Sequence, residues 1–427
     1  MRIFRLNFLV LVYLPIAIAI SGQSAGPQIA SPDALLRDQP VAITVTGLKP
    51  ESSYTLRAEF ASRAGTIWRS EAEFRADSKG EIDISKMAPL SGSYTGVDPT
   101  GLIWSLQNSK EKSPDGLTFD SDDQSVLNVM VREGDKTIAQ KYIILRNRDI
   151  GVSTTEVRGE VTGTFFSSKL SGRVPAIISL GGSEGGFDRS YAALLASHGF
   201  PVLALGYFGT ENLPKDLERI PIETVDRAVE WLAKQQGVDS SRIVVLGRSK
   251  GAELALVAAA NGPRIKGVIA IAPSSVIWEG ISQSKESLSS WTVGGKDIPF
   301  APYVKSEEYI KSRRLIDLYD PSFDKAPVES HIAVERIAGP ILLIAGKNDL
   351  LWPSSRMADA IATRLAAKNF KYKVLNRQWD NVGHHVGSVP NRPTADSVRL
   401  GGTPQSISKA QFEAWREIIV FLNSLKR

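Results

Sequence analysis

The chain has 427 residues, 42% hydrophobic and 23% charged, which is typical of a folded protein of two or three domains and excludes a disordered chain or a membrane bundle. The formal net charge is only +5 without a dense run of lysines and arginines, so we expect no nucleic-acid partner. The absence of cysteine excludes disulfides and thiolate chemistry, and with only four histidines we expect neither a metal nor another cofactor.

Residues 1–25 have the pattern of a secretory signal peptide. Two arginines form a short positive region, residues 6–20 are almost wholly apolar, and small or polar residues follow. We therefore expect a secreted or periplasmic protein that is cleaved after Ser21 or Ala25 and has no stable membrane span afterwards. An uncleaved anchor is the alternative.

Residues 26–145 predict an immunoglobulin-like β-sandwich. Apolar and polar side chains alternate through residues 41–45, 54–60 and 126–131, as in strands with one buried face. Turn sequences such as Asp77-Ser78-Lys79-Gly80 separate these runs at the spacing of a sandwich. No catalytic group of residues stands out in this part of the chain.

Residues 146–427 predict an α/β-hydrolase domain. A connector over residues 146–173, with an extended segment at 160–166, leads into alternating strands and helices. We expect strands at 176–180, 201–205, 242–246, 266–271, 340–345 and 371–375, and helices at 189–198, 222–235, 252–260, 355–367 and 409–425. Such alternation indicates a mostly parallel sheet covered by helices on both faces. Residues 275–335 interrupt the rhythm and predict an insertion over the strand ends.

The sequence Gly247-Arg248-Ser249-Lys250-Gly251 joins a strand-like run to a helix-like run. This is the G-x-S-x-G pattern of a nucleophile elbow, in which a sharp turn lifts one serine out of the sheet at a helix N-terminus. Ser249 is therefore the candidate nucleophile. An ordinary Gly/Ser turn is the alternative.

A serine nucleophile needs a base, and α/β-hydrolases supply an acid and then a histidine later in the chain. Asp349 follows the strand at 340–345, where an acid is expected, although a surface turn would also accommodate an aspartate. His384 and His385 are the histidines that remain beyond Asp349. We favour His384 because it directly follows Gly383.

Two backbone N–H groups are needed to stabilise the oxyanion. Lys250, the residue after the nucleophile, should supply one. The other should come from the glycine-rich loop at 181–186, with Ser183 as the first choice and Glu184 as the second. The side chains of Lys250 and Arg248 either meet an anionic substrate or are solvated surface charges.

The remaining histidines and several tryptophans have less specific interpretations. His198 is expected to cap or pack against a helix, and His331 to be structural or near the substrate. Trp278, Trp291 and Trp352 are either core residues or part of the substrate pocket.

The sequence resembles the acyl-CoA thioesterase and bile acid-CoA:amino acid N-acyltransferase family over nearly its whole mature length. The matching stretches occur in order through both parts of the chain: Gly47–Pro50, Tyr54–Ala58, Gly65–Ser70, Gly92–Gly96, Gly101–Leu106, Gly181–Gly186, Gly247–Gly251, Gly346–Trp352, Gly383-His384, Gly401–Thr403 and Ala410–Trp415. The resemblance implies a β-sandwich joined to an α/β-hydrolase domain, with a triad of Ser249, Asp349 and His384. Family members with serine at the nucleophile position resemble thioesterases, whereas the amino-acid transferases use cysteine.

These observations predict an enzyme that hydrolyses acyl thioesters or esters of small molecules through an acyl-serine intermediate. The alternatives are an exported carboxylesterase or lactonase, an acyltransferase to an amine or alcohol, and a binding protein without catalytic activity. A signal peptide would place the chain outside the cytoplasm, where acyl-CoA is scarce.

Overall fold

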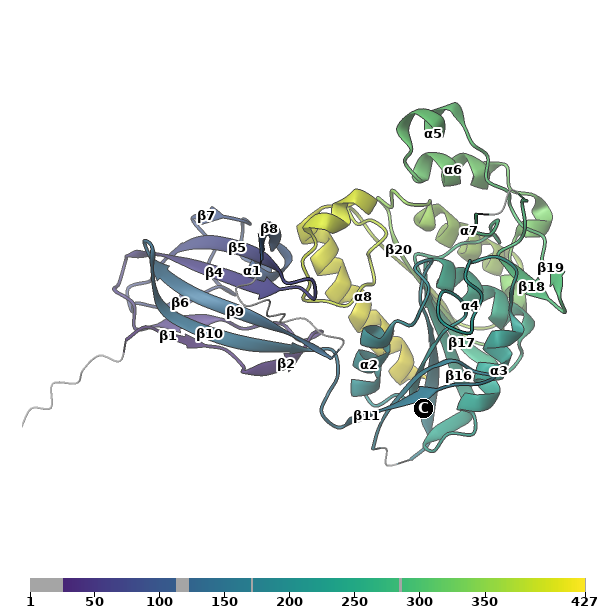
Figure 1. Cartoon of the computed structure of the whole chain (residues 1–427), viewed down its shortest axis with the longest axis horizontal. Helices are drawn as coiled ribbons and strands as arrows, with labels where there is room; N and C mark the ends of the chain where they lie inside the picture. Colours follow the sequence, from purple (N-terminus) through teal and green to yellow (C-terminus); the bar gives the residue numbers. More distant parts are fainter. Residues whose placement is uncertain (1–25, 113–122, 170–171, 284–285, 427) are drawn as a thin grey trace, which may run out of the picture.

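The computed structural model describes residues 26–112, 123–169, 172–283 and 286–426. A sheet-rich N-terminal part lies beside a larger part in which helices surround a long sheet, and the C-terminal helix α8 (Pro404–Ser424) lies where the two parts meet (Figure 1). The expected signal peptide lies outside the described residues. Within the described ranges, no helix combines the length and apolar character needed to cross a membrane.

The N-terminal part consists of two sheets that pack around one core. One sheet has the order β1-β3-β6 and the other β2-β10-β9-β4-β5-β7, with β8 also paired to β5. Buried side chains such as Val45, Ile82, Leu56 and Val129 from both sheets fill the space between them. The elements are β1 (Gln28–Ala30), β2 (Ala34–Leu36), β3 (Thr44–Thr46), β4 (Ser53–Ala61), β5 (Thr66–Arg75), β6 (Ile82–Asp83), β7 (Ser91–Gly92), α1 (Gly101–Trp104), β8 (Gln107–Lys112), β9 (Gln124–Glu133) and β10 (Lys136–Arg146).

The C-terminal part contains an eight-stranded sheet in the order β11-β12-β14-β13-β16-β17-β20-β21. The first two strands are antiparallel to their neighbours, and the pairs from β14 to β21 are parallel. This arrangement confirms the predicted α/β-hydrolase fold class. The strands are β11 (Val152–Val157), β12 (Gly163–Ser168), β13 (Val174–Leu180), β14 (Val202–Leu205), β16 (Val238–Arg248), β17 (Ile265–Ile271), β20 (Ile341–Gly346) and β21 (Val374–Trp379).

Helices cover both faces of this sheet, and two separate apolar cores lie between them and the strands. The helices of the C-terminal part, besides α8, are α2 (Arg189–Ser197), α3 (Glu223–Leu232), α4 (Lys250–Asn261) and α7 (Ser354–Ala367). The expected insertion between β17 and β20 contains β18 (Trp291–Val293), β19 (Lys296–Asp297), α5 (Glu307–Ser312), α6 (Ile316–Asp324), η2 (Val328–Ser330) and η3 (Val334–Arg336). β18 pairs with β15 (Ile220–Pro221), and the short helix η4 (Ala395–Leu400) precedes α8.

Several elements differ from the sequence prediction, among them β16, which starts four residues before the predicted strand. The connector contains an additional strand, β11, whose alternation is weak because four of its six residues are exposed. The last strand is Val374–Trp379, so its start lies three residues beyond the predicted one. Helix α8 starts at Pro404, five residues early, because Thr403 caps it by accepting a hydrogen bond from the backbone of Ser406 and proline is favourable in the first turn.

Polar contacts join the two parts of the chain. The buried carboxylate of Asp38, beyond β2, lies 2.6 Å from His198 Nε2 at the end of α2 and accepts a hydrogen bond of 2.8 Å from Trp415 Nε1 on α8. His198 is thus the helix-end packing residue that its sequence position predicts.

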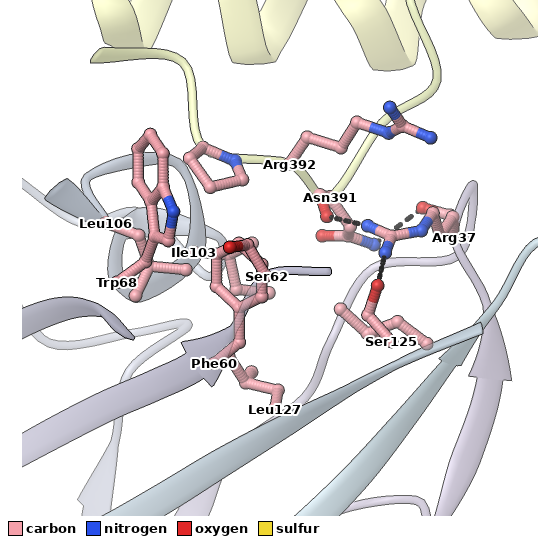
Figure 2. A pocket seen from close by; sticks show the side chains of 12 residues that line it. Arg37, Phe60, Ser62, Trp68, Ile103, Leu106, Ser125, Leu127, Asn391 and Arg392 are labelled. Atoms are coloured by element: carbon pink, nitrogen blue, oxygen red, sulfur yellow. Dashed lines mark hydrogen bonds between the residues drawn. The ribbon is translucent and has the colours of Figure 1, made fainter. Parts of the chain in front are cut away.

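A second set of contacts holds the loop before η4 against the N-terminal part, as Figure 2 shows. Arg37 donates to the carbonyl of Asn391 at 2.6 Å and to the hydroxyl of Ser125, and the Asn391 side chain donates back to the carbonyl of Arg37 at 2.7 Å. The N–H of Thr394 donates to the carbonyl of Trp104 at 3.0 Å. A cavity of about 300 Å³ lies beside these contacts, with Phe60 in its wall.

The shared carboxylate of Asp38 should stabilise the whole chain. Asp38→Ala removes the acceptor for the buried Trp415 indole and the partner of the partly buried His198 ring, so we expect the free energy of unfolding to fall by about 1–3 kcal/mol. Denaturant unfolding measures this change. The matched control is Asp135→Ala, because the Asp135 side chain is fully exposed and its ion pair with Arg132 spans 3.6 Å. Equal stability of the two variants would contradict the role of Asp38.

Candidate active site

Ser249 stands at the sharp turn between β16 and α4, in the middle of the parallel sheet. Its backbone has φ 55° and ψ −121°, a conformation that residues other than glycine rarely adopt. Its N–H donates to the carbonyl of Ile271 at 2.9 Å, and its carbonyl accepts from Ala252 and Glu253 in the first turn of α4. The serine predicted from the G-x-S-x-G pattern therefore occupies a strained turn at a helix N-terminus.

The two glycines of the pattern permit close contacts between backbones. A Cβ atom on Gly247 would lie 2.0 Å from the carbonyl oxygen of Gly251. A Cβ atom on Gly251 would lie 2.1 Å from the carbonyl oxygen of Gly181, in the glycine-rich loop. The elbow and that loop consequently approach each other more closely than side chains would allow.

Asp349 and His384 come together although 35 residues separate them. His384 Nδ1 lies 2.8 Å from Asp349 Oδ2. Asp349 also accepts a hydrogen bond from the hydroxyl of Ser354 at 2.6 Å and from the backbone N–H groups of Leu351 and Trp352 at 2.9 and 3.3 Å. When Nδ1 donates to this carboxylate, Nε2 of His384 is left as a proton acceptor.

Ser249, His384 and Ser183 line a single cavity of about 360 Å³. Asp349 does not line the cavity and lies behind the His384 ring, with a side chain only 2% exposed. Among the described residues, the Ser249 hydroxyl makes no hydrogen bond with His384 or any other group. The other lining residues are Gly182, Glu184, Arg248, Ile271, Ala272, Leu351, His385, Gly387, Ser388 and Leu400.

The two adjacent histidines differ in their surroundings. Burial, together with the neighbouring charges of His384 and Arg248, lowers the pKa of His385 to about 4. His385 is therefore a neutral imidazole at neutral pH, and its Nδ1 lies 3.4 Å from the Ser388 hydroxyl. Only His384 of the pair contacts the carboxylate of Asp349.

The glycine-rich loop follows β13, and its first two carbonyl groups bind a buried tyrosine. Tyr207, a buried residue just beyond β14, donates from its hydroxyl to the carbonyls of Gly181 at 2.8 Å and Gly182 at 3.0 Å. Burial, reinforced by the nearby carboxylates of Glu184 and Glu253, raises the pKa of Tyr207 well above its usual value, so the hydroxyl keeps its proton. Ser183 lies at the exposed tip of the loop, on the wall of the cavity.

The two cations of the elbow have different environments, and both expectations for the Lys250 side chain are wrong. Its side chain is 1% exposed and pairs with the fully buried Glu253 across 2.7 Å, so it neither meets solvent nor lines the cavity. Arg248 does line the cavity, but Asp188 at 2.7 Å and Glu184 at 3.3 Å already pair with its guanidinium. Both contacts are made by Arg248 Nη2, whereas the buried Nε has no hydrogen-bond partner among the described residues.

The three tryptophans singled out in the sequence are fully buried. The ring of Trp352 lies edge-on to that of His384, with centroids 5.8 Å apart. Tyr319 contacts both Trp352 and Trp278, which joins the insertion to the back of the histidine. These residues are core residues and do not line the cavity described above.

The sequence did not predict the roles of three residues that hold the candidate site in place: Tyr207, Ser354 and Glu253. Ser354 begins a helix five residues after Asp349, and a serine in that position is an ordinary helix-start residue. Tyr207 follows the expected strand at 201–205, where a tyrosine is normally interpreted as a hydrophobic core residue. Only Glu253 could have been noticed in the sequence, because a charged residue inside the apolar run of α4 indicates a buried partner.

Both parts of the chain are similar to proteins of known family. The chain matches the family described as acyl-CoA thioester hydrolase/BAAT, with its N-terminal region at residues 38–158 and its C-terminal region at residues 220–425. Acyl-coenzyme A thioesterase 3 of Mus musculus is 31% identical over 91% of this chain and 91% of its own length.

The chain belongs to this family. The mitochondrial acyl-coenzyme A thioesterase 2 of Rattus norvegicus is 32% identical over 90% of this chain and 86% of its own length. The peroxisomal succinyl-coenzyme A thioesterase of Mus musculus is 29% identical over 90% of this chain and 93% of its own length. The resemblance seen in the sequence is confirmed, and so is the expectation of an enzyme of the hydrolase class.

The strained backbone of Ser249 should lower stability. Glycine adopts a positive φ without steric cost, so we expect Ser249→Gly to be more stable than Ser249→Ala by about 1 kcal/mol, after the larger unfolded-state entropy of glycine is included. Urea unfolding of the two variants measures the difference. Both variants lack the hydroxyl, so the comparison isolates the backbone. A glycine variant no more stable than the alanine variant would show that the turn is unstrained.

Proposed function

We propose that this protein hydrolyses acyl thioesters, with Ser249 as nucleophile, His384 as general base and acid, and Asp349 as the carboxylate that orients the imidazole. The single observation that carries the proposal is the Asp349–His384 hydrogen bond behind a cavity that Ser249 also lines. The names of the relatives, acyl-coenzyme A thioesterases, support the substrate class.

The reaction proceeds in two acyl-transfer steps. As substrate enters the cavity, His384 Nε2 takes the Ser249 proton while Oγ bonds to the thioester carbonyl carbon. The C–S bond then breaks, and the proton on Nε2 passes to the leaving sulfur. Water repeats the attack on the acyl-serine, again with His384 as base, and releases the carboxylic acid. The Ser249–His384 hydrogen bond forms in the substrate complex, since such contacts often tighten only there.

The oxyanion of each tetrahedral intermediate requires donors that point to one place. The backbone N–H of Lys250 is suited to this because the first N–H groups of a helix have no partner within the helix. Ser183 N–H is the second donor, on the loop in which Tyr207 holds the carbonyls of Gly181 and Gly182. Both residues were selected from the sequence.

Substitution of the triad tests the proposal. We expect Ser249→Ala and His384→Ala to lower kcat on short- and long-chain acyl thioesters by at least about 10³-fold, and Asp349→Asn by a similar factor, because each removes an essential group. Steady-state thiol release measures this loss. Ser388→Ala, which changes another serine on the same cavity wall, serves as the control and should retain turnover. Near-normal turnover in Ser249→Ala would contradict the mechanism.

The same preparation separates hydrolysis from its alternatives. A fluorophosphonate should label Ser249, as found by peptide mass spectrometry, because only an activated serine reacts readily. Absence of labelling would favour a binding protein. Formation of an N-acyl product with added amino acids would favour an acyltransferase, and hydrolysis of lactones or oxygen esters alone would favour the esterase alternative.

We propose further that the protein is exported. The proposal rests on the sequence of residues 1–25 alone, since relatives carry the names mitochondrial and peroxisomal. In a Gram-negative host we expect the periplasmic fraction to contain a chain that begins after Ser21 or Ala25, as measured by intact mass. Leu11→Arg, which interrupts the apolar run, should leave full-length chain in the cytoplasm. A full-length, cytoplasmic wild-type chain would overturn this proposal.

A further inference from the structure

A buried ion pair lies directly behind the nucleophile turn. Lys250 Nζ and Glu253 Oε2 are 2.7 Å apart, one turn of α4 separates the two residues, and neither side chain is more than 1% exposed. Burial lowers the pKa of Lys250 and raises that of Glu253, while their mutual attraction opposes both shifts. Removal of two charges from water is costly unless hydrogen bonds satisfy both groups.

The insertion supplies those hydrogen bonds. Glu253 Oε1 accepts from the backbone N–H of Trp278 at 3.0 Å and from Trp291 Nε1 at 2.7 Å. Lys250 Nζ donates to the Ser290 hydroxyl at 2.7 Å, which in turn donates to the carbonyl of Trp278 at 2.9 Å. The insertion segments around residues 278 and 290 therefore meet at this single pair.

Lys250 thus has two roles at once. Its backbone follows the strained Ser249, at the position where an N–H can face an oxyanion. Its side chain is fixed at the opposite end by Glu253 and Ser290, and the ammonium lies 5.2 Å from the centre of the Trp291 ring. A rotation of the peptide between residues 249 and 250 would move a side chain whose end is held by three groups.

We propose that the Lys250–Glu253 pair is a positioning device, which uses the insertion to hold the Lys250 N–H in the direction that stabilises the oxyanion. The inference rests on the proposed function. An ion pair of this kind is not needed for stability alone, because well-packed apolar side chains often replace buried pairs without loss. Lys250 and Glu253 are accordingly positioning residues through their side chains.

The test compares an oxygen ester with its thionoester, in which sulfur replaces the carbonyl oxygen and accepts hydrogen bonds poorly. A wild-type enzyme with an aligned oxyanion site should prefer the oxygen ester strongly in kcat/KM. We expect Lys250→Met and the double variant Lys250→Met/Glu253→Gln to lower kcat on the oxygen ester about 10²-fold, with KM changed less than about threefold. Their preference for the oxygen ester should shrink at least tenfold.

Two controls separate positioning from stability. Ile418→Ala removes a fully buried side chain of α8 and should lower the melting temperature without changing the ester preference. Lys409→Met removes a lysine from the exposed pair with Glu413 on the same helix and should change neither quantity. If the Lys250 variants do not fold, Ser290→Ala removes only one acceptor and should still reduce the preference several-fold.

The outcomes are distinguishable. An unchanged ester preference in folded Lys250→Met or Ser290→Ala would overturn the positioning role and leave the proposed function intact. A wild-type protein that hydrolyses neither thioesters nor these esters and does not react with a fluorophosphonate would overturn the proposed function, and this inference with it.

Discussion

The site depends on the close approach of three backbone segments at the elbow. Strand β16, helix α4 and the loop after β13 meet where Gly247 and Gly251 leave no room for a Cβ atom. This contact forces Ser249 into a strained turn and brings the 181–186 loop beside it. The positions of Ser249, the first N–H groups of α4 and the wall of the cavity all depend on that close approach.

Fixed partners around this centre restrict the side chains that would otherwise move. Asp349 receives hydrogen bonds from Ser354, Leu351 and Trp352, so its carboxylate has one orientation toward His384. The ring of Trp352 packs against the imidazole ring of His384 and restricts its movement on another side. Such restriction suits the proposed role of His384 as a base, since small displacements of catalytic groups cost much of the rate.

Sequence patterns predicted the fold class well because both parts have strong periodicity and the elbow has a steric signature. Ser249, Asp349 and His384 were selected by their order and by their places after strands, and the structure brings the last two into contact. Glu253 and Tyr207 were not predicted because their roles arise from partners at least 25 positions away in the chain, and Ser354 was not predicted because a serine at the start of a helix is ordinary. The burial of Lys250 was missed for the same reason: its partners Ser290 and Trp291 lie some forty residues later.

The segment between His384 and α8 is attached to the N-terminal sheets through Asn391 and Thr394. Ser249, Asp349 and His384 thus belong to one part of the chain, while hydrogen bonds to the other part hold the segment that follows His384. Separation of the two parts would therefore remove hydrogen bonds that hold the segment after His384 in place. The N-terminal sheets thus constrain this segment mechanically, although none of their described residues lines the cavity.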